Sequence, residues 1–266
     1  MKYLAATCAS FISYLSFLPM HTPTITGLID RRILLNFRAD PAVVRRLLPP
    51  PFRPQLVREH AIVGICLIRL RHERLKRLPA AFGMASENGA HRFAVEWEDA
   101  GQLRQGVYIP RRDTSSKLNA VLGQQLLGIH SHSTFTVAEE AGHYAVSFQS
   151  PDGTQLAVEA RETHAWPASS LFSTLAQASE FFRRGAVGYS PRSSGPGFDG
   201  VELHTNDWQV SPLAVQHVAS SFFSDTDLFP AGSVVFDDAL LMRSVAHDWQ
   251  RLPVLQGRAA GHLVGQ

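Results

Sequence analysis

Apolar residues recur at every second position in several stretches of this chain, which is the pattern of strands that bury one face. Ile33, Leu35 and Phe37 alternate with Arg32, Leu34 and Asn36 and predict a mostly buried strand. Similar patterns predict strands over 61–70, 91–97, 103–109, 133–137, 143–148, 155–161, 201–210 and 233–249. The residues Pro151-Asp152-Gly153 form a tight-turn sequence between two of these stretches, which predicts a hairpin.

Three segments have the signals of helices instead. Asp40-Pro41 supplies an N-cap and a proline at the first helical position, and Pro49-Pro50-Pro51 ends that short helix. A second helix is predicted over 118–129, with Asp113 or Ser115 as its cap, and a third from Ser169-Ser170 to Arg184 with Gly185 as its end. Many short strands with few helices favour an α+β, mostly β fold, a closed or half-closed β-barrel that carries helices outside it.

The pattern also divides the chain. Residues 21–256 are predicted to form one domain, and 257–266 a frayed tail. Residues 1–20 are predicted to be an extension, either unstructured or the result of a wrongly placed start codon. A secretory signal is the alternative, because one lysine precedes an apolar run, although no small-x-small cleavage site follows it. This apolar run is shorter than a membrane-spanning helix, so we expect no membrane insertion.

Composition narrows the class of partner. An apolar content of 45% with 18% charged residues is ordinary for a globular protein with a sizeable core. A net charge of +2 is too weak to indicate nucleic acid as an electrostatic partner. The two cysteines, Cys8 and Cys66, cannot form a disulfide framework, which favours a cytoplasmic location with secretion as the alternative.

Amine chemistry depends on a single lysine. Of the 25 basic residues, only Lys2, Lys76 and Lys117 are lysines, and arginine does not lose its proton in proteins. Lys117 follows Arg111 and Arg112 and is expected in the first turn of a helix, where the helix dipole and neighbouring cations would lower its pKa. A solvent-facing lysine at a helix start is the simpler interpretation, because a strongly perturbed lysine also needs burial.

Other candidate groups lie on the approach to a predicted strand. Glu87 is a candidate acid or base, and Arg92 could hold a carboxylate through its planar fork. An ordinary polar loop would contain the same residues. His130-Ser131-His132 has the spacing of half a metal site on one strand face, but no third ligand can be assigned, so we predict no metal. No phosphate-binding or dinucleotide motif occurs, and no cofactor is predicted.

Several segments together resemble a known superfamily. The stretch 38–52 is similar to the amino-terminal segment of acetoacetate decarboxylases, and Gly106 to Arg112 falls where those enzymes carry their Pro-Lys-Lys segment. A closer likeness is to an uncharacterised bacterial domain-of-unknown-function family in that superfamily, through Glu87 to Tyr108 and the stretch Trp208 to Trp249. The resemblance covers most of residues 28–252 and implies an acetoacetate decarboxylase-like antiparallel β-barrel with a central cavity and a few outer helices.

The resemblance does not carry the activity with it. Pro110-Arg111-Arg112 stands where the decarboxylases have Pro-Lys-Lys, so the aligned nucleophile is missing. We therefore expect a protein that binds a small anionic ligand, a keto acid or another carboxylate, through Arg111, Arg112 and Arg92. One alternative is a Schiff-base lyase or decarboxylase that uses Lys117 with Glu87. The other is a non-catalytic structural or interaction protein. A homo-oligomer is compatible with all three.

Overall fold

The computed structural model describes residues 24–122 and 129–257, and within them the chain is mostly β. The expected extension at 1–20 and nearly all of the expected tail at 257–266 lie outside these residues. The first half contains β1 (Ile25–Ala39), α1 (Pro41–Leu47), β2 (Arg53–Pro54), β3 (Leu56–Val57), β4 (His60–Leu75), η1 (Ala80–Phe82), β5 (Met84–Asp99), β6 (Gln102–Thr114) and α2 (Lys117–Leu122). The second half contains β7 (Ser131–His132), β8 (Thr134–Glu140), β9 (His143–Gln149), β10 (Gln155–Glu162), α3 (Leu175–Arg184), β11 (Val187–Pro191), β12 (Phe198–His204), β13 (Ser211–Ser220) and β14 (Val234–Leu255).

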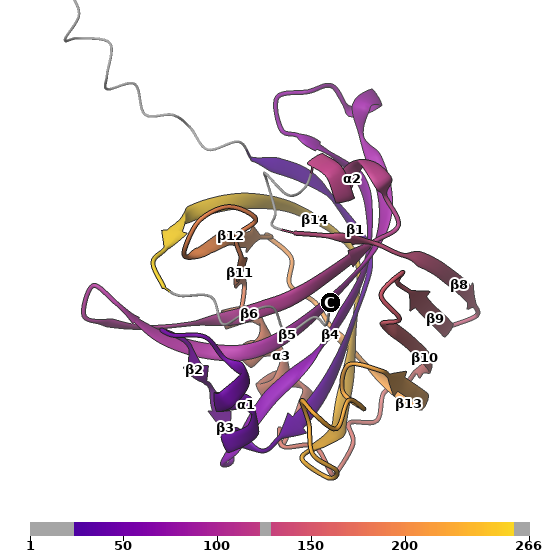
Figure 1. Cartoon of the computed structure of the whole chain (residues 1–266). Helices are drawn as coiled ribbons and strands as arrows, with labels where there is room; N and C mark the ends of the chain where they lie inside the picture. The colour runs from indigo at the N-terminus through magenta and orange to yellow at the C-terminus, as the bar shows by residue number, and fades with distance from the viewer. Residues whose placement is uncertain (1–23, 123–128, 258–266) are drawn as a thin grey trace, which may run out of the picture.

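Seven strands close into a ring. Their order is β1, β4, β5, β6, β11, β12 and β14, and β14 pairs in turn with β1 (Figure 1). Six of these seven pairings are antiparallel, but β6 and β11 run parallel and share only two residue pairs, Val107 with Gly188 and Tyr108 with Tyr189. The expected barrel of antiparallel strands is therefore a mixed ring with one short parallel seam.

A second sheet covers part of the outside of this ring. It consists of β8, β9, β10 and β13, which lie together at the right of Figure 1. Strands β9 and β10 turn alternate residues inward, as Tyr144, Val146 and Phe148 do on β9. These side chains pack with Ile33, Leu35 and other outward residues of the ring, and together they form the larger apolar core. Pro151-Asp152-Gly153 does form the turn of the predicted β9–β10 hairpin.

A smaller apolar core fills one part of the inside of the ring. It includes Leu34 and Cys66 from the strands, together with Ala178 and Phe182 from α3. The amphipathic helix α3 thus turns its apolar face toward inward-facing strand residues. Because this core occupies only part of the interior, the remaining inward positions are free to line a pocket.

Each of the three predicted helices has a counterpart among the described residues, but not all of the predicted bounds are correct. Helix α1 begins as expected, with the Asp40 carboxylate accepting from the Ala42 amide. The expected start of the third helix at Ser169-Ser170 is wrong, because Ser170 donates to buried Asp237 and α3 begins only after Thr174. The expected cap at Asp113 is also wrong, because β6 continues to Thr114; α2 begins at Lys117, and part of the predicted helix lies outside the described residues.

Strands β11 and β13 were not predicted from the pattern of apolar residues. Strand β11 is only five residues long, and β13 mixes exposed and half-buried positions without a clear alternation. In the described part of the chain, no helix is both long and apolar enough to cross a membrane.

Candidate functional site

A pocket of about 410 Å³ opens among inward-facing residues of the ring. Every one of the seven ring strands supplies part of its lining, including Gly188 from the short strand β11. We call it the arginine pocket, because four arginine side chains line it, Arg74 at its outer end and the other three further in. The lining also includes Ile25, Cys66, Ile68, Glu73, Leu75, Leu78, Phe82, Met84, Asn88, Ala90, Leu118 and His130.

The three arginines come from three neighbouring ring strands, Arg32 from β1, Arg92 from β5 and Arg112 from β6. Each is the inward member of an alternating strand segment, since residues beside them such as Ile33 and Phe93 belong to the outer core. Cys66 of β4 lies among them, because its thiol accepts from Arg32 Nε at 3.3 Å and interacts electrostatically with Arg92 and Arg112.

None of these three guanidinium groups forms a salt bridge with any described residue. Arg92 donates to Asn36 Oδ1 and Arg112 to Ser190 Oγ at 3.2 Å, so neutral groups hold both. Nε of Arg92 and one terminal nitrogen of Arg32 are buried without a hydrogen-bond partner. Burial lowers the pKa of Arg92 and of Arg112 to about 10, which leaves both cationic at neutral pH.

A chain of buried polar groups fixes Arg92 from behind. Asn36, which accepts from Arg92, donates through Nδ2 to Asp238 Oδ1 at 2.6 Å. Ser170 Oγ donates to the neighbouring Asp237 at 2.8 Å. The guanidinium carbon of Arg92 also lies 4.7 Å from the centre of the Phe182 ring. Held by an amide and stacked on an aromatic ring, this side chain has little freedom to leave the pocket.

Arg111, expected to bind ligand with Arg112, is already paired on the opposite face of β6. Its guanidinium donates to both oxygens of Asp113 at 2.8 Å and also to Asp152 in the β9–β10 turn. Although burial raises the pKa of Asp152, the hydrogen bond from Arg111 lowers it to about 2. Arg111 therefore holds the second sheet against the ring, and only Arg112 of the pair lines the pocket.

Glu87, the expected acid or base, lies on the outward face of β5, where two arginines form salt bridges with its carboxylate. Its carboxylate accepts from Arg31 at 2.6 Å and from Arg69 at 2.5 Å, and both arginines also contact Glu139 of β8. The Arg31 side chain is only 1% exposed, so this group is a buried ionic network between the ring and the second sheet. Its inward neighbour Asn88 lines the arginine pocket, whereas Glu87 does not.

Lys117 is the first residue of α2, as its sequence position suggested, but its side chain is exposed. The next residue, Leu118, lines the mouth of the arginine pocket, and Lys117 is not among the lining residues. Of the two arginines expected to perturb it, Arg111 is bound to carboxylates and Arg112 points into the pocket. The structure thus brings Arg92 and Arg112 together and leaves Lys117, Glu87 and Arg111 outside.

Sequence reasoning missed three residues of this site: Arg32, Cys66 and Glu73. Arg32 could have been found, because it is the charged inward member of an alternating strand. Cys66 was interpreted as a small core residue, which is half correct, since it belongs to the inner core and also lines the pocket. Burial raises the pKa of the third, Glu73, to about 7, and its Oε1 has no hydrogen-bond partner.

The two histidines of His130-Ser131-His132 do not share a strand face. His130 lines the arginine pocket, whereas His132 lines a second pocket on the outer face of the second sheet. Within residues 24–122 and 129–257, no group of three or more His, Cys, Asp or Glu side chains is placed to hold a metal ion. The spacing of the pair thus gave the wrong geometry, because strand β7 begins only at Ser131.

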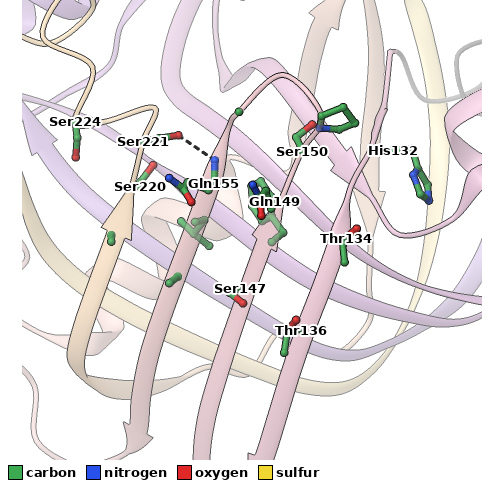
Figure 2. A pocket seen from close by; sticks show the side chains of 16 residues that line it. His132, Thr134, Thr136, Ser147, Gln149, Ser150, Gln155, Ser220, Ser221 and Ser224 are labelled. Atoms are coloured by element: carbon green, nitrogen blue, oxygen red, sulfur yellow. Dashed lines mark hydrogen bonds between the residues drawn. The ribbon is translucent and has the colours of Figure 1, made fainter.

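This second pocket, of about 900 Å³, is open and lined mainly by hydroxyl and amide groups (Figure 2). Thr134, Thr136, Ser147 and Gln149 lie on neighbouring strands in Figure 2, and Ser221 accepts from the Gln155 amide at 3.0 Å. Its lining residues contain no Asp, Glu, Lys or Arg, so nothing in it would select a charged ligand. The arginine pocket is the stronger candidate because its cations have no acidic partner among the described residues.

Comparison with known proteins agrees with this fold. A family model for DUF2071, described as an uncharacterized conserved protein, matches residues 29–238. No curated protein matches the chain. Among solved structures, an acetoacetate decarboxylase-like enzyme from Sphingomonas wittichii RW1 is similar, with a TM-score of 0.55 and 13% identity over 94% of this chain and 99% of that one.

Two further structures have the same architecture. Acetoacetate decarboxylase from Legionella pneumophila has a TM-score of 0.52 and 10% identity, over 90% of this chain and 88% of that chain. The enduracididine biosynthesis enzyme MppR, complexed with the condensation product of pyruvate and imidazole 4-carboxaldehyde, also has a TM-score of 0.52, with 12% identity over 89% of each chain. At these identities the likeness establishes the acetoacetate decarboxylase-like fold and nothing of the chemistry.

Proposed function

The chain belongs to the uncharacterized DUF2071 family and has an acetoacetate decarboxylase-like fold, and from this premise we propose that it binds a small carboxylate in the arginine pocket. The ligand class is a monocarboxylate or a keto acid. Arg112 and Arg32 would contact the carboxylate directly, and Arg92 would supply a third positive charge from the floor of the pocket.

One observation carries this proposal, namely that the pocket gathers three guanidinium groups without a carboxylate partner. The buried arginines elsewhere, Arg31 and Arg111, each contact two acidic side chains. A buried charge without a partner costs several kcal/mol, so a fold retains it where a ligand provides the missing charge. The fork of a guanidinium matches the two oxygens of a carboxylate, which makes this anion a better fit than a halide.

Keto acids are the first probes to use within this class. The structurally similar MppR is described in complexes with pyruvate and with a condensation product of pyruvate. A keto acid would place its carboxylate on the arginines and its carbonyl beside the Cys66 thiol and Asn88, two uncharged polar groups of the lining.

Isothermal titration calorimetry with pyruvate, 2-oxobutyrate and butyrate at pH 7 tests the proposal. We expect saturable binding of each acid and none of methyl butyrate, the uncharged ester. Arg112→Gln should weaken binding about 10- to 100-fold, because a hydrogen bond to a charged group contributes about 1.5–3 kcal/mol. Arg104→Gln is the matched control, since Arg104 is exposed on the same strand and outside the pocket.

Two results would count against carboxylate binding. Equal affinity for butyrate and methyl butyrate would mean that the arginines do not recognise charge. Equal losses in Arg112→Gln and Arg104→Gln would place the site elsewhere. Imine chemistry through Lys117 has no support of this kind, because that side chain is exposed and does not line the pocket.

A further inference from the structure

The outer end of the arginine pocket is lined by exposed apolar side chains. Large hydrophobic residues are exposed at eight positions among residues 24–122 and 129–257, and five of these line this one pocket. They are Leu75, Leu78, Phe82, Met84 and Leu118. We call this group the apolar mouth. Phe82, on η1 between β4 and β5, is 65% exposed, which is unfavourable for a phenyl ring unless something covers it.

The strand register places the apolar mouth and the arginines at opposite ends of the pocket. Ile25 pairs with Leu75 at the mouth, and Arg32 pairs with Ile68 seven residues further along the same two strands. At a rise of about 3.3 Å per residue this separation is roughly 20 Å. Arg112 pairs with Ala90, which pairs with Cys66, so it lies deeper still, and Arg92 pairs with Gly64 beyond that.

The wall between these two ends is mainly apolar. Ile68 and Leu70 of β4 contribute apolar surface, as does Trp249 of β14, which pairs with Ile25. Arg74, which also lines the outer end, donates to the carbonyl oxygens of His72 and Leu78. Glu73 is the acidic group of the lining nearest the mouth in the register, pairing with Met84. Burial raises its pKa to about 7, so a large part of the population carries a neutral carboxyl at physiological pH.

We propose that the ligand is a carboxylate with an aliphatic tail, whose head group reaches the arginines while its tail lies along the apolar wall and ends at the apolar mouth. This inference rests on the proposed carboxylate site and adds the substrate class. A keto acid of two to four carbons would leave the mouth uncovered. A long-chain acid, whose extended tail spans roughly 20 Å, would cover it and remove the exposed phenyl ring of Phe82 from water.

A series of straight-chain acids measures the tail directly. We would titrate butyrate, octanoate, decanoate and hexadecanoate by calorimetry at pH 7, each below its micelle concentration, with octanol as the uncharged partner. Burial of one methylene contributes about 0.8 kcal/mol, so affinity should rise about fourfold with each added carbon until the tail leaves the pocket. Octanol should bind far more weakly than octanoate.

Variants at the apolar mouth distinguish a specific tail site from nonspecific hydrophobic binding. Leu78→Ser and Phe82→Ser should leave butyrate affinity unchanged and abolish the gain for the outer carbons of hexadecanoate. Leu103→Ser is the matched control, because Leu103 is an equally exposed leucine that does not line the pocket. All three side chains are exposed, so far-UV circular dichroism should confirm an unchanged fold.

The outcomes distinguish this inference from the one on which it rests. Equal affinity for butyrate and decanoate, both lost in Arg112→Gln, would keep the carboxylate site and overturn the tail. A chain-length gain that survives in Leu78→Ser and Phe82→Ser would also overturn the assignment of the tail to this mouth. Absence of binding by every acid in the series would overturn the carboxylate site and the tail together.

Discussion

Replacing Glu73 by glutamine should change how the stability of the fold depends on pH. The Glu73 side chain is 6% exposed, its Oε1 has no hydrogen-bond partner, and no arginine or lysine pairs with it among the described residues. Burial alone raises its pKa from 4.5 to about 7. The variant Glu73→Gln keeps the shape of the side chain but cannot ionise.

The sign of the effect follows from proton linkage. Between pH 4.5 and pH 7 the unfolded chain ionises this carboxyl while the folded chain keeps it protonated, so the unfolded state binds fewer protons. The free energy of unfolding then falls as pH rises, by about 1.4 kcal/mol for each pH unit, and the decrease ends near pH 7. Over the whole window the loss is about 3 kcal/mol, which is a large part of the stability of an ordinary domain.

Urea denaturation followed by tryptophan fluorescence at pH 5, 6, 7 and 8 would measure this loss. The difference in unfolding free energy between Glu73→Gln and the unmodified protein should shift in favour of the variant by about 2.5 kcal/mol from pH 5 to pH 8. Contributions of other titrating groups cancel in this difference. Glu98→Gln, at an exposed position on β5, is the control and should show no such shift. Parallel stability curves for Glu73→Gln and the unmodified protein would refute a protonated Glu73.

Two further predictions concern His91 and Arg112. His91 is fully buried against Phe222, with ring centroids 4.5 Å apart, and burial, helped by the Arg111 charge, lowers its pKa to about 3. Its neutral form therefore contributes stability that is lost as pH falls from 6.5 toward 3. In the same urea assay, the unfolding free energy of His91→Phe should gain about 3 kcal/mol relative to that of the unmodified protein between pH 7 and pH 4. A difference that does not change with pH would contradict this prediction. Arg112→Lys would place a primary amine beside Arg32 and Arg92. Burial and the neighbouring positive charges should lower the pKa of this amine. The neutral amine could then condense with the ketone of acetoacetate to form an imine, releasing water. Borohydride should then trap an adduct at position 112, whereas Arg111→Lys, on the paired face, should give none; trapping in both variants would contradict the assignment of faces.

Local patterns predicted much of this fold. Alternating apolar residues placed β1, β5, β9 and β10, and the Asp40-Pro41 signal placed α1, because one buried face leaves a direct record in the order of residues. No local pattern in the sequence indicates that the strands close into a ring. It depends on β14, which is 22 residues long and pairs with β1, β12 and β13, and pairings between distant segments are not local properties.

The side chains of the site were harder to assign than the strands, because two irregularities change which residues face inward. In β4 the register shifts between Leu70 and Glu73, where His72 has a φ of 56°. Strict alternation from Leu70 would turn His72 inward and Glu73 outward, but the extra residue moves the Glu73 carboxyl into the pocket. A bulge of this kind has no clear sequence signal here, so a buried carboxyl was not predicted.

The second irregularity decides the meaning of the Arg111-Arg112 pair. Phe93 pairs with Tyr108 and His91 with Arg111, so β6 has one residue more than β5 between these pairs, around Pro110. Ile109 lines the pocket, and alternation without the bulge would bring Arg111 inward after it. With the bulge, Arg111 instead reaches Asp113 and Asp152, and Arg112 takes the inward place. One inserted residue thus directs Arg111 to the carboxylates that join the two sheets and leaves Arg112 available to a ligand. Two adjacent arginines in the sequence therefore have different roles in the fold.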